Sequence, residues 1–560
     1  MVKYWLAGML DEEIRNLEKQ RHTKVRDRAA MRNHLEAETM SKTWCRSGKV
    51  QITRDLFYSL KKPGSDTPEY EEHSDRMAEI ARNYQEGLQD MESVVDQQRR
   101  DREMDDVLDC IQASVPESER EKMAGMTGQE EIRKAIKDLP DGKAAGMDGL
   151  PHELWRVLVD QHSENEKHKK PSFDVVKLLR LLYNDIEQEG MFEGTGFSKG
   201  WMCPIYKKSD WTEIANYRPI TVLNTDYKIF KRVLTTQLSS AAPGIIHQDQ
   251  AGFMKGRKIE DHTKLVKLMI AACEADELNS AIVCLDQEKA YDKISHNFLF
   301  RSLSKVGLPK HFIDTVQCLY YDAHTVVIIN GEVSSPFKIT RGVRQGDPLS
   351  CLLFNIAIES LATMLWESDL EGLHGCGSAE QTIATLFADD TTVYLSESDS
   401  FSDLQAILQK WCWASRAKFN VQKTEITPVG SAGYCAEVLE RRKLHAGHPE
   451  IPPQIHIAKD GEPVRVLGAF VGNKVDQVNV WQPVLERTDD ALAHWEKTRP
   501  TQEGRRLIVG MVVVGYTQYL TRVQGMPKGV EALFTKKVRR FMSGDKRVPM
   551  VGLHVLHGNI

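Results

Sequence analysis

Two adjacent acidic residues stand between segments that favour β-structure. Asp389 and Asp390 separate residues 382–386 from residues 391–395. Both segments are rich in β-branched residues, which predicts a β-hairpin with two carboxylates at its tip. Two unit charges about 4 Å apart at an effective dielectric constant near 20 repel each other by roughly 4 kcal/mol. Adjacent aspartates need not face each other, so this pair alone does not define a site.

A second predicted strand, residues 281–285, also ends in a carboxylate, Asp286. Strands that each deliver an aspartate to one sheet edge provide the oxygen ligands that hard divalent cations prefer. Such a cage is what two-metal phosphoryl transfer requires, with Asp286 and Asp389 bridging the metals and Asp390 assisting. The alternative is that Asp286 caps a helix and the other two residues form a solvated turn. We favour the metal site because further motifs accompany it.

A ring and a Gly-rich loop follow the first aspartate. Tyr291 lies five residues after Asp286, where its ring could lie under the sugar of a nucleotide and exclude a 2′-hydroxyl; alternatively it is a core aromatic. Residues 340–350 contain glycines that allow a tight path, and Asp347 fits the N-cap of a following helix. In this loop Gln345 could contact the nucleotide and Arg344 a template phosphate.

Basic residues recur beside aromatic ones. Lys207 and Arg218 could place cations on a triphosphate, one as a point charge and the other as a bidentate fork. Lys255 and Arg257 lie in a basic loop suited to a template backbone. Solvated surface charge is the alternative for each of them.

Two later positions complete the candidates. Lys423 follows a predicted helix and could protonate departing pyrophosphate as a general acid, although a single lysine is usually surface charge. Gly468 lies in a Gly-punctuated strand pair that could approach a primer backbone closely or could be a simple hairpin.

The composition sets the frame for these motifs. The chain has 560 residues, 41% hydrophobic and 28% charged, with a net charge of −6, so any nucleic-acid contact must come from local basic patches. Ten cysteines without zinc spacing favour a reduced intracellular compartment. The longest apolar run, 507–516, is too short to span a bilayer and predicts a buried helix. The order of helical and strand-like patterns along the chain predicts three regions. These are a helical extension at 1–125, a mixed α/β core of fingers and palm at 126–475 with its motifs at about 195–472, and a helical end at 476–560.

Taken together, the motifs from about residue 142 to residue 472 resemble the reverse transcriptases of non-LTR (LINE-type) retrotransposons. The resemblance is carried, in order, by Gly142-Lys143-Ala144-Ala145-Gly146-Met147-Asp148-Gly149, Tyr217-Arg218-Pro219-Ile220, Gln250-Ala251-Gly252-Phe253 with Gly256-Arg257, Leu285-Asp286 through Tyr291-Asp292, Arg344-Gln345-Gly346-Asp347-Pro348-Leu349-Ser350, Phe387-Ala388-Asp389-Asp390, Lys423-Thr424-Glu425 and Leu467-Gly468. Their number and order make it specific.

The resemblance implies an α+β right-hand polymerase with fingers, palm and thumb, and with an antiparallel palm sheet. It implies RNA-directed DNA synthesis with two Mg²⁺ ions, which Mn²⁺ could replace. The expected partners are an RNA template, a DNA primer and deoxynucleoside triphosphates, with no membrane and no obligate protein partner. By position, Asp286, Asp389 and Asp390 resemble the metal carboxylates and Tyr291 the sugar gate. Action on chromosomal DNA would make the protein nuclear.

The chain also departs from the family pattern. Met147 stands where the fingers motif usually has proline, and we find no motif of an endonuclease or a ribonuclease H. We therefore expect a truncated copy. Two alternatives follow: a catalytically inactive nucleic-acid-binding relic, and an RNA-templated RNA polymerase, against which the ring of Tyr291 argues.

Overall fold

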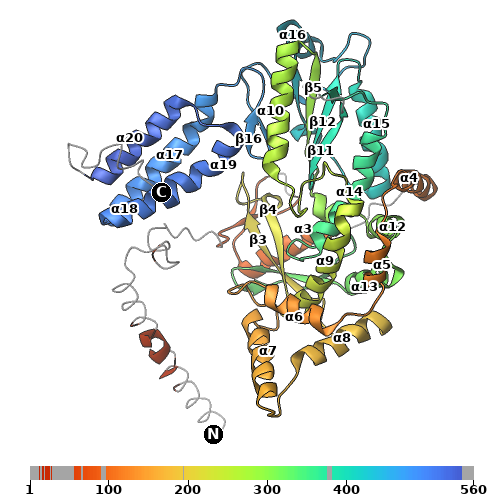
Figure 1. The fold of residues 1–560 in the computed structure, drawn as a ribbon, viewed down its shortest axis with the longest axis vertical. Coiled ribbons are helices and arrows are strands. Elements are labelled where there is room, and N and C mark those ends of the chain that lie inside the picture. The colour runs from red at the N-terminus through yellow and green to blue at the C-terminus, as the bar shows by residue number, and fades with distance from the viewer. Residues whose placement is uncertain are drawn as a thin grey trace. The chain divides into compact units, whose positions relative to one another are not determined.

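The computed structural model describes residues 56–64, 67–89, 96–192, 194–374 and 381–544, with a few positions before residue 56. The chain divides into two compact units. The larger unit comprises Thr53–Leu467 and Val471–Val475, and the smaller comprises Met1–Ile52, Gly468–Phe470 and Asp476–Ile560. The larger unit mixes helices and strands, whereas the described residues after Asp476 are helical (Figure 1).

An antiparallel sheet carries the acidic motifs of the larger unit. Its order is β11-β12-β5-β13-β14, and only the last pair in this order is parallel. The bounds are β5 Ser280–Leu285, β11 Ala384–Phe387, β12 Asp390–Ser396, β13 Glu425–Val429 and β14 His456–Ile457. Phe387 pairs with Asp390, so a two-residue turn joins β11 to β12. The predicted hairpin is therefore confirmed.

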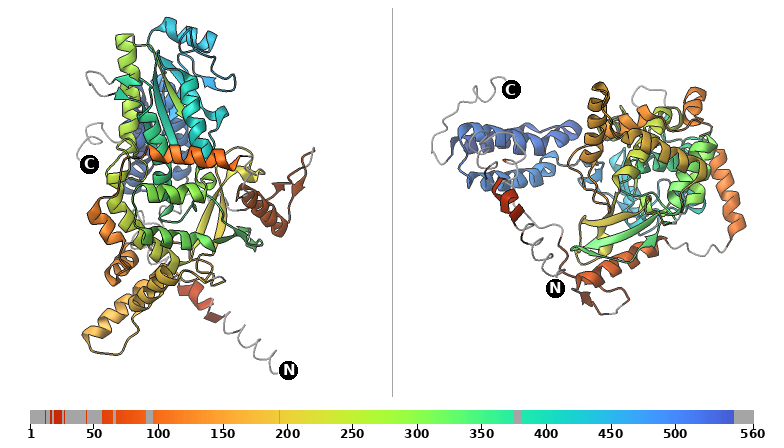
Figure 2. Two further views of the ribbon diagram at one scale, coloured as in Figure 1. Left: turned by 90° about the vertical axis from the view of Figure 1, so that its right-hand side faces the viewer. Right: turned by 90° about the horizontal axis from the view of Figure 1, so that it is seen from below.

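Helices cover both faces of this sheet because its strands are apolar on both sides. Along β5, Val283 and Leu285 belong to one hydrophobic cluster and Ile282 to another, as the two-residue period of a strand requires. The first cluster includes α14 (Ser350–Trp366) and α15 (Phe401–Ser415), and the second includes α10 (Ile259–Asp276). Figures 1 and 2 show α10 and α15 on opposite sides of the sheet. The sheet edge with the carboxylates is thus held by a rigid, two-sided core.

A second sheet lies in the same unit. Its order is β4-β3-β6-β7, and β8 also pairs with β6. The bounds are β3 Gly200–Tyr206, β4 Tyr217–Leu223, β6 His324–Ile329, β7 Glu332–Val333 and β8 Phe337–Lys338. β3 and β4 form a seven-residue antiparallel pair that places Ile205 opposite Arg218. This pairing brings the two predicted basic segments together.

The remaining helices of the larger unit pack around the two sheets. They are α4 Gln97–Asp109, α5 Glu117–Met123, α6 Gln129–Asp138, α7 His152–Lys167, α8 Val175–Glu189, α9 Thr225–Ile245, α11 Ala290–Lys293, α12 His296–Lys305, α13 Lys310–Tyr321 and α16 Ala432–Arg441. Two short strand pairs, β1 (Leu60–Lys61) with β2 (Tyr70–Glu71) and β9 (Leu373–His374) with β10 (Gln381–Thr382), complete it. The helix α14 is buried almost all round and begins at Ser350, with Leu349 as its N-cap. The predicted N-cap, Asp347, lies two residues earlier, where its side chain accepts a 2.9 Å hydrogen bond from Leu349 N–H.

The second half of the predicted extension at 1–125 belongs to the larger unit, which begins at Thr53. Helix α3 (Ser74–Gln89) packs in the larger unit, where Ala78 and Ala81 are fully buried. At its end, the Gln89 side-chain oxygen accepts hydrogen bonds from the backbone N–H groups of Thr340 (3.0 Å) and Arg341 (3.1 Å). The structure thus joins the first described helix to the loop that precedes Gln345. The solvated helix predicted at 11–38 lies largely outside the described residues.

The smaller unit contains α17 (Gln477–Glu496), α18 (Gln502–Val509), a π-helical turn (Gly510–Val514), α19 (Gly515–Gln524) and α20 (Lys528–Ser543). The apolar run at 507–516 lies in α18, the π-turn and α19, so it is helical as predicted, but it is only partly buried, with Val514 51% exposed. Of the helices in the described part of the chain, none has the length and apolar character needed to cross a membrane. The chain passes between the units at β15 (Val464–Val466) and β16 (Ala469–Val471).

Candidate functional site

The three predicted carboxylates meet at one edge of the antiparallel sheet. Asp286 follows the last residue of β5, Asp390 is the first residue of β12, and Asp389 lies in the turn before it. Because Thr391 pairs with Leu285, the next step of the register sets Asp390 opposite Asp286. Residues opposite each other in an antiparallel pair have Cα atoms about 4.5–5.5 Å apart. Residues more than 100 positions apart in the sequence are therefore neighbours here.

Burial and mutual proximity raise the pKa values of two of these carboxylates. Burial raises the pKa of Asp389, and the Asp286 carboxylate raises it further. Burial raises the pKa of Asp390 to about 6, with additional contributions from the charges of Asp389 and Asp286. Desolvation and like charges both disfavour the ionised form of a carboxylate. A cation placed among these oxygens would relieve both costs.

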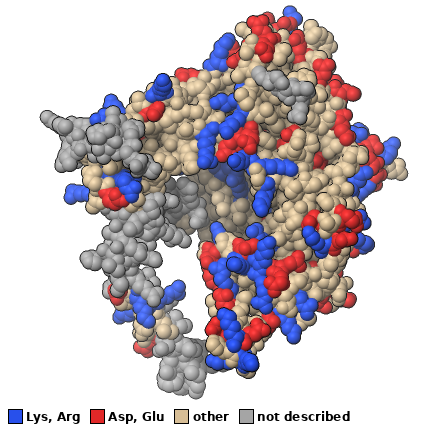
Figure 3. All heavy atoms as spheres, viewed as in Figure 1, with Lys and Arg blue, Asp and Glu red and all other residues tan. Residues whose placement is uncertain are grey.

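Three cations surround the acids. The Lys423 ammonium lies 3.1 Å from an Asp286 carboxylate oxygen, and both side chains are partly exposed. Lys207 follows β3, and its pKa is lowered by partial burial and by the charges of Arg218 and Lys423, while Asp286 opposes this shift. Figure 3 shows basic and acidic side chains interleaved on the face that carries these strands. The edge is therefore suited to a ligand that brings both phosphates and metal ions.

The donor set fits a hard divalent cation. It consists of carboxylate oxygens, which Mg²⁺ and Mn²⁺ prefer. Burial first, and neighbouring carboxylates second, raise the pKa values of Asp389 and Asp390. Within the described ranges, no three His, Cys, Asp or Glu side chains are already gathered as ligands of one ion. Asp286 is instead paired with Lys423.

The residues predicted to contact a nucleotide lie in well-packed surroundings. The ring of Tyr291 stacks on Phe354 at 4.7 Å, and burial raises the pKa of its hydroxyl. The backbone carbonyl of Gln345 accepts a hydrogen bond of 2.7 Å from Thr221 N–H of β4. A Cβ atom on Gly346 would lie 2.3 Å from the Thr221 carbonyl oxygen. Only glycine therefore permits this close approach of the loop to the second sheet.

Two predicted template contacts do not fit the structure. Arg344 is 4% exposed, and its guanidinium donates to the carbonyl oxygens of Ser198 (2.5 Å) and His324 (3.5 Å). Arg257 is half-buried and donates to three carbonyl oxygens of its own loop, those of Ile246, His247 and Gln250. Both guanidinium groups are thus used to bind backbone, and the predicted phosphate contacts are replaced by structural ones.

The remaining template or primer candidates, Lys255 and Gly468, differ in exposure and in what they contact. Lys255 is exposed, as a phosphate contact requires. Gly468 belongs to the smaller unit, where its backbone has φ +84° and an added Cβ would lie 3.2 Å from the Tyr519 ring. Its close approach is therefore to a protein side chain.

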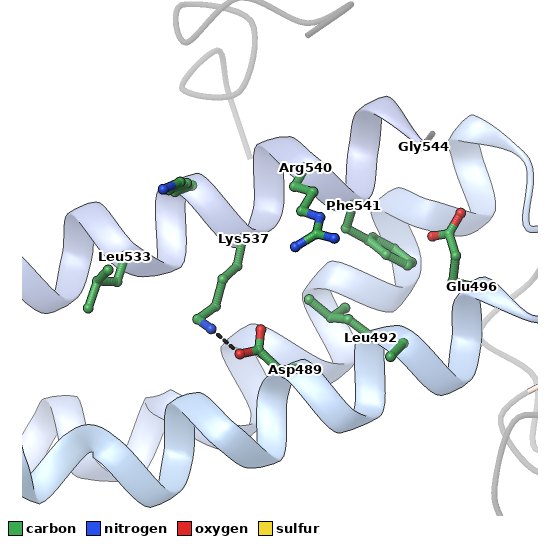
Figure 4. Close-up of a pocket in the computed structure, with 10 residues that line it drawn as sticks. Asp489, Leu492, Glu496, Leu533, Lys537, Arg540, Phe541 and Gly544 are labelled. Carbon is green, nitrogen blue, oxygen red and sulfur yellow. Dashed lines mark hydrogen bonds and ion pairs between the residues drawn. The ribbon is translucent and has the colours of Figure 1, made fainter. Parts of the chain in front are cut away.

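A groove lined by three basic and two acidic residues lies in the smaller unit between α17 and α20 (Figure 4). Its volume is about 530 Å³. Leu492, Leu533 and Phe541 supply its apolar lining, and Lys537 pairs with Asp489 across it. Lys536 and Arg540, one turn apart on α20, add further positive charge.

The structure also reveals buried polar residues that the motif analysis did not single out for a role. Gln250 is 1% exposed and Asn355 is fully buried, and both bind the backbone beside the hairpin turn. Lys231 of α9 is fully buried 3.3 Å from an Asp347 carboxylate oxygen. A signal was available, since Lys231 and Asn355 each interrupt an apolar helical segment. Polar residues at such positions are rarely left without partners.

Comparison with known proteins agrees with this arrangement. Residues 205–469 match the family described as reverse transcriptase (RNA-dependent DNA polymerase). A Xenopus laevis protein, the transposon TX1 uncharacterized 149 kDa protein, is 25% identical over 72% of this chain and 29% of its own length. The Pol polyprotein of the Drosophila melanogaster type-2 retrotransposable element R2DM is 30% identical over 42% of this chain and 22% of its own length.

A third relative is the RNA-directed DNA polymerase from the Drosophila melanogaster mobile element jockey. It is 25% identical over 57% of this chain and 34% of its own length. In each of these three relatives the matched part is about a third of the protein or less.

Proposed function

We propose that this chain, whose residues 205–469 form a domain of the reverse transcriptase family, is an RNA-directed DNA polymerase. It would add deoxynucleotides to a primer 3′-hydroxyl by metal-assisted phosphoryl transfer. In a right-hand polymerase, the antiparallel sheet would be the palm, the β3–β4 sheet with its helices the fingers, and the helices after Asp476 the thumb. The relatives' names, which describe a retrotransposable element and a mobile element, support a retrotransposon as the source.

The observation that carries this proposal is the meeting of Asp286, Asp389 and Asp390 at one strand edge beside Lys207 and Lys423. Carboxylates that must ionise at neutral pH are costly to crowd together unless they bind cations. Triphosphates and their metal ions provide that compensation. If the three carboxylates had only a structural role, the nearby Lys207 and Lys423 would have no evident function.

The chain's own side chains would divide the work. Two Mg²⁺ ions held by the three carboxylates would, when bound, supply Lewis-acid stabilisation of the attacking and leaving oxygens. Lys207 and Arg218 would hold the triphosphate, and Lys423 would give its proton to the departing pyrophosphate. Gln345 would contact the incoming nucleotide, and the Tyr291 ring would exclude a 2′-hydroxyl.

The partners follow from this role. An RNA template, a DNA primer and deoxynucleoside triphosphates would be the substrates, with Lys255 on the template backbone and the groove between α17 and α20 on the duplex. The basic residues of that groove suit a phosphate backbone. Action on chromosomal DNA would place the protein in the nucleus.

Primer extension on an RNA template tests the proposal. We expect purified protein to extend a DNA primer with deoxynucleotides in Mg²⁺ and not in EDTA. Asp389→Asn should lower the rate by about 10³-fold or more, since the metal contributes several kcal/mol to transition-state stabilisation. The matched control is Asp403→Asn, an exposed carboxylate in the first turn of α15 with the same charge change.

Three outcomes would contradict the proposal. Filter binding of a primed template with no extension by the wild type would favour the inactive nucleic-acid-binding relic. Preferential incorporation of ribonucleotides by the wild type would favour an RNA polymerase. Equal activity of Asp389→Asn and Asp403→Asn would refute the assignment of the site.

A further inference from the structure

The turn that carries Asp389 has a backbone conformation that its own residues do not favour. Ala388 has φ +56°, in the left-handed region. For residues other than glycine, asparagine and aspartate this region costs roughly 1–2 kcal/mol, and such strain persists only where the surroundings hold it in place. Something outside the hairpin must therefore fix the residue that directly precedes Asp389.

Gln250 provides that support. Its side-chain oxygen accepts a 2.8 Å hydrogen bond from Ala388 N–H, and its side-chain nitrogen donates to the Ala388 carbonyl oxygen at 3.3 Å. One amide thus binds both backbone groups of the strained residue. The same oxygen accepts a 2.8 Å hydrogen bond from Gly252 N–H, which orients the amide. We infer that Gln250 is a positioning residue that sets the place of the Asp389 carboxylate for metal binding.

The loop around Gln250 is fitted to the turn at close range. Residues 249 and 251 exchange backbone hydrogen bonds of 2.8 Å with Leu386 at the end of β11. A Cβ atom on Gly252 would lie 2.2 Å from Ala388 N and 2.9 Å from the carbonyl carbon of Phe387. Because these neighbours are backbone atoms, they cannot move aside without shifting the turn. The loop at residues 249–252 and the turn at residues 387–389 should therefore move together.

Two further side chains hold the loop itself. Asn355, fully buried in α14, donates to the Gly252 carbonyl oxygen at 2.7 Å. Arg257 donates to the Gln250 carbonyl oxygen at 2.6 Å. The support of Asp389 thus extends from the turn through Gln250 to the central helix. This inference rests on the proposed function for its catalytic consequence, whereas its mechanical part stands without it.

The experiment compares Gln250→Ala with a matched control, Asn279→Ala. Asn279 precedes β5 at the opposite end of the same sheet, where its side chain accepts hydrogen bonds from Ser431 N–H and O–H and donates to Glu397. Both variants lose an amide that binds backbone. Only the first is expected to affect the edge that carries Asp389.

Hydrogen exchange measures the mechanical part without any substrate. Exchange at Ala388 N–H should accelerate at least tenfold in Gln250→Ala and stay unchanged in Asn279→Ala. Gln250→Glu retains an acceptor for this N–H, and it should restore slow exchange. If Gln250→Ala does not fold, Gln250→Met, which keeps the side-chain length without the amide, takes its place. Unchanged exchange at Ala388 in the variant without the amide would overturn the inference.

Metal binding and turnover measure the consequence. Titration of the protein alone with Mn²⁺, followed by electron paramagnetic resonance, should show at least fivefold weaker binding in Gln250→Ala. In primer extension, kcat should fall at least tenfold while the Kd for primed template stays within twofold. Equal loss of Mn²⁺ affinity in Asn279→Ala would mean general destabilisation and would overturn the inference. If the wild type binds Mn²⁺ as described but extends no primer, the proposed function fails and the positioning role stands.

Discussion

The buried pair Lys231 and Asp347 should be one of the strongest energetic couplings in the larger unit. Both side chains are 0% exposed, and the ammonium nitrogen lies 3.3 Å from a carboxylate oxygen. Burial lowers the pKa of Lys231, and the Asp347 charge acts in the opposite direction. The ammonium also lies over the Tyr320 ring at 4.6 Å. We predict that Lys231→Met unfolds more easily than wild type because it leaves the Asp347 carboxylate buried without a compensating positive charge.

The size of the effect follows from the environment. Removing one partner of a buried ion pair costs about 3–5 kcal/mol, whereas replacing both with well-packed neutral groups is often neutral or stabilising. The double variant Lys231→Met/Asp347→Asn should therefore be within about 1–2 kcal/mol of wild type. Asparagine can still accept the 2.9 Å hydrogen bond from Leu349 N–H that Asp347 accepts. If each single variant loses about 3–5 kcal/mol and the double variant at most about 2 kcal/mol, the expected coupling energy is at least about 4 kcal/mol, well above that of sites without contact.

Urea denaturation of the wild type, both single variants and the double variant gives this coupling directly. The matched control is Lys310→Met, which breaks the exposed pair Lys310–Asp314, with side chains 86% and 50% exposed. An exposed pair is worth about 0–1 kcal/mol. Additive losses in the double variant, or a loss in Lys231→Met no larger than in Lys310→Met, would refute the reasoning.

Two further predictions concern the site. Tyr291→Ala should lower discrimination against ribonucleotides by about 10- to 100-fold, the range that a steric pocket provides, whereas Tyr291→Phe should keep it. Competitive incorporation of matched deoxy- and ribonucleotides measures this discrimination. Unchanged selectivity in Tyr291→Ala would contradict the role of Tyr291 as a sugar gate. Because the pKa of Asp390 is about 6 and metal binding requires the ionised form, Mn²⁺ affinity of the protein alone should be about 4-fold weaker at pH 5.5 than at pH 7.5. Calorimetric titration at the two pH values checks this, Asp390→Asn should remove the difference, and a pH-independent affinity in the wild type would contradict it.

Local pattern sufficed for the parts of the site that lie on strands. The β-branched residues of 382–386 and 391–395 predicted the hairpin, and the carboxylates at the strand ends predicted which residues lie close together, because a strand fixes the direction of its end. The roles of the arginines could not be predicted in this way. Whether Arg257 or Arg344 meets a phosphate or a carbonyl depends on chain segments distant in sequence. The strained conformation of Ala388 and the amide of Gln250 that holds it in place are likewise visible only in three dimensions.

The anchoring of Gln89 on Thr340 and Arg341 has a practical consequence for anyone who expresses a minimal polymerase fragment. A piece that spans only the matched motifs would discard α3 and leave those two N–H groups facing a vacated surface. The two hydrogen bonds would be lost from the segment that leads into Gln345, which is distant from α3 in the sequence but in contact with it in the structure. A fragment intended to retain native chemistry should therefore start before β1, near residue 53, where the compact unit itself begins.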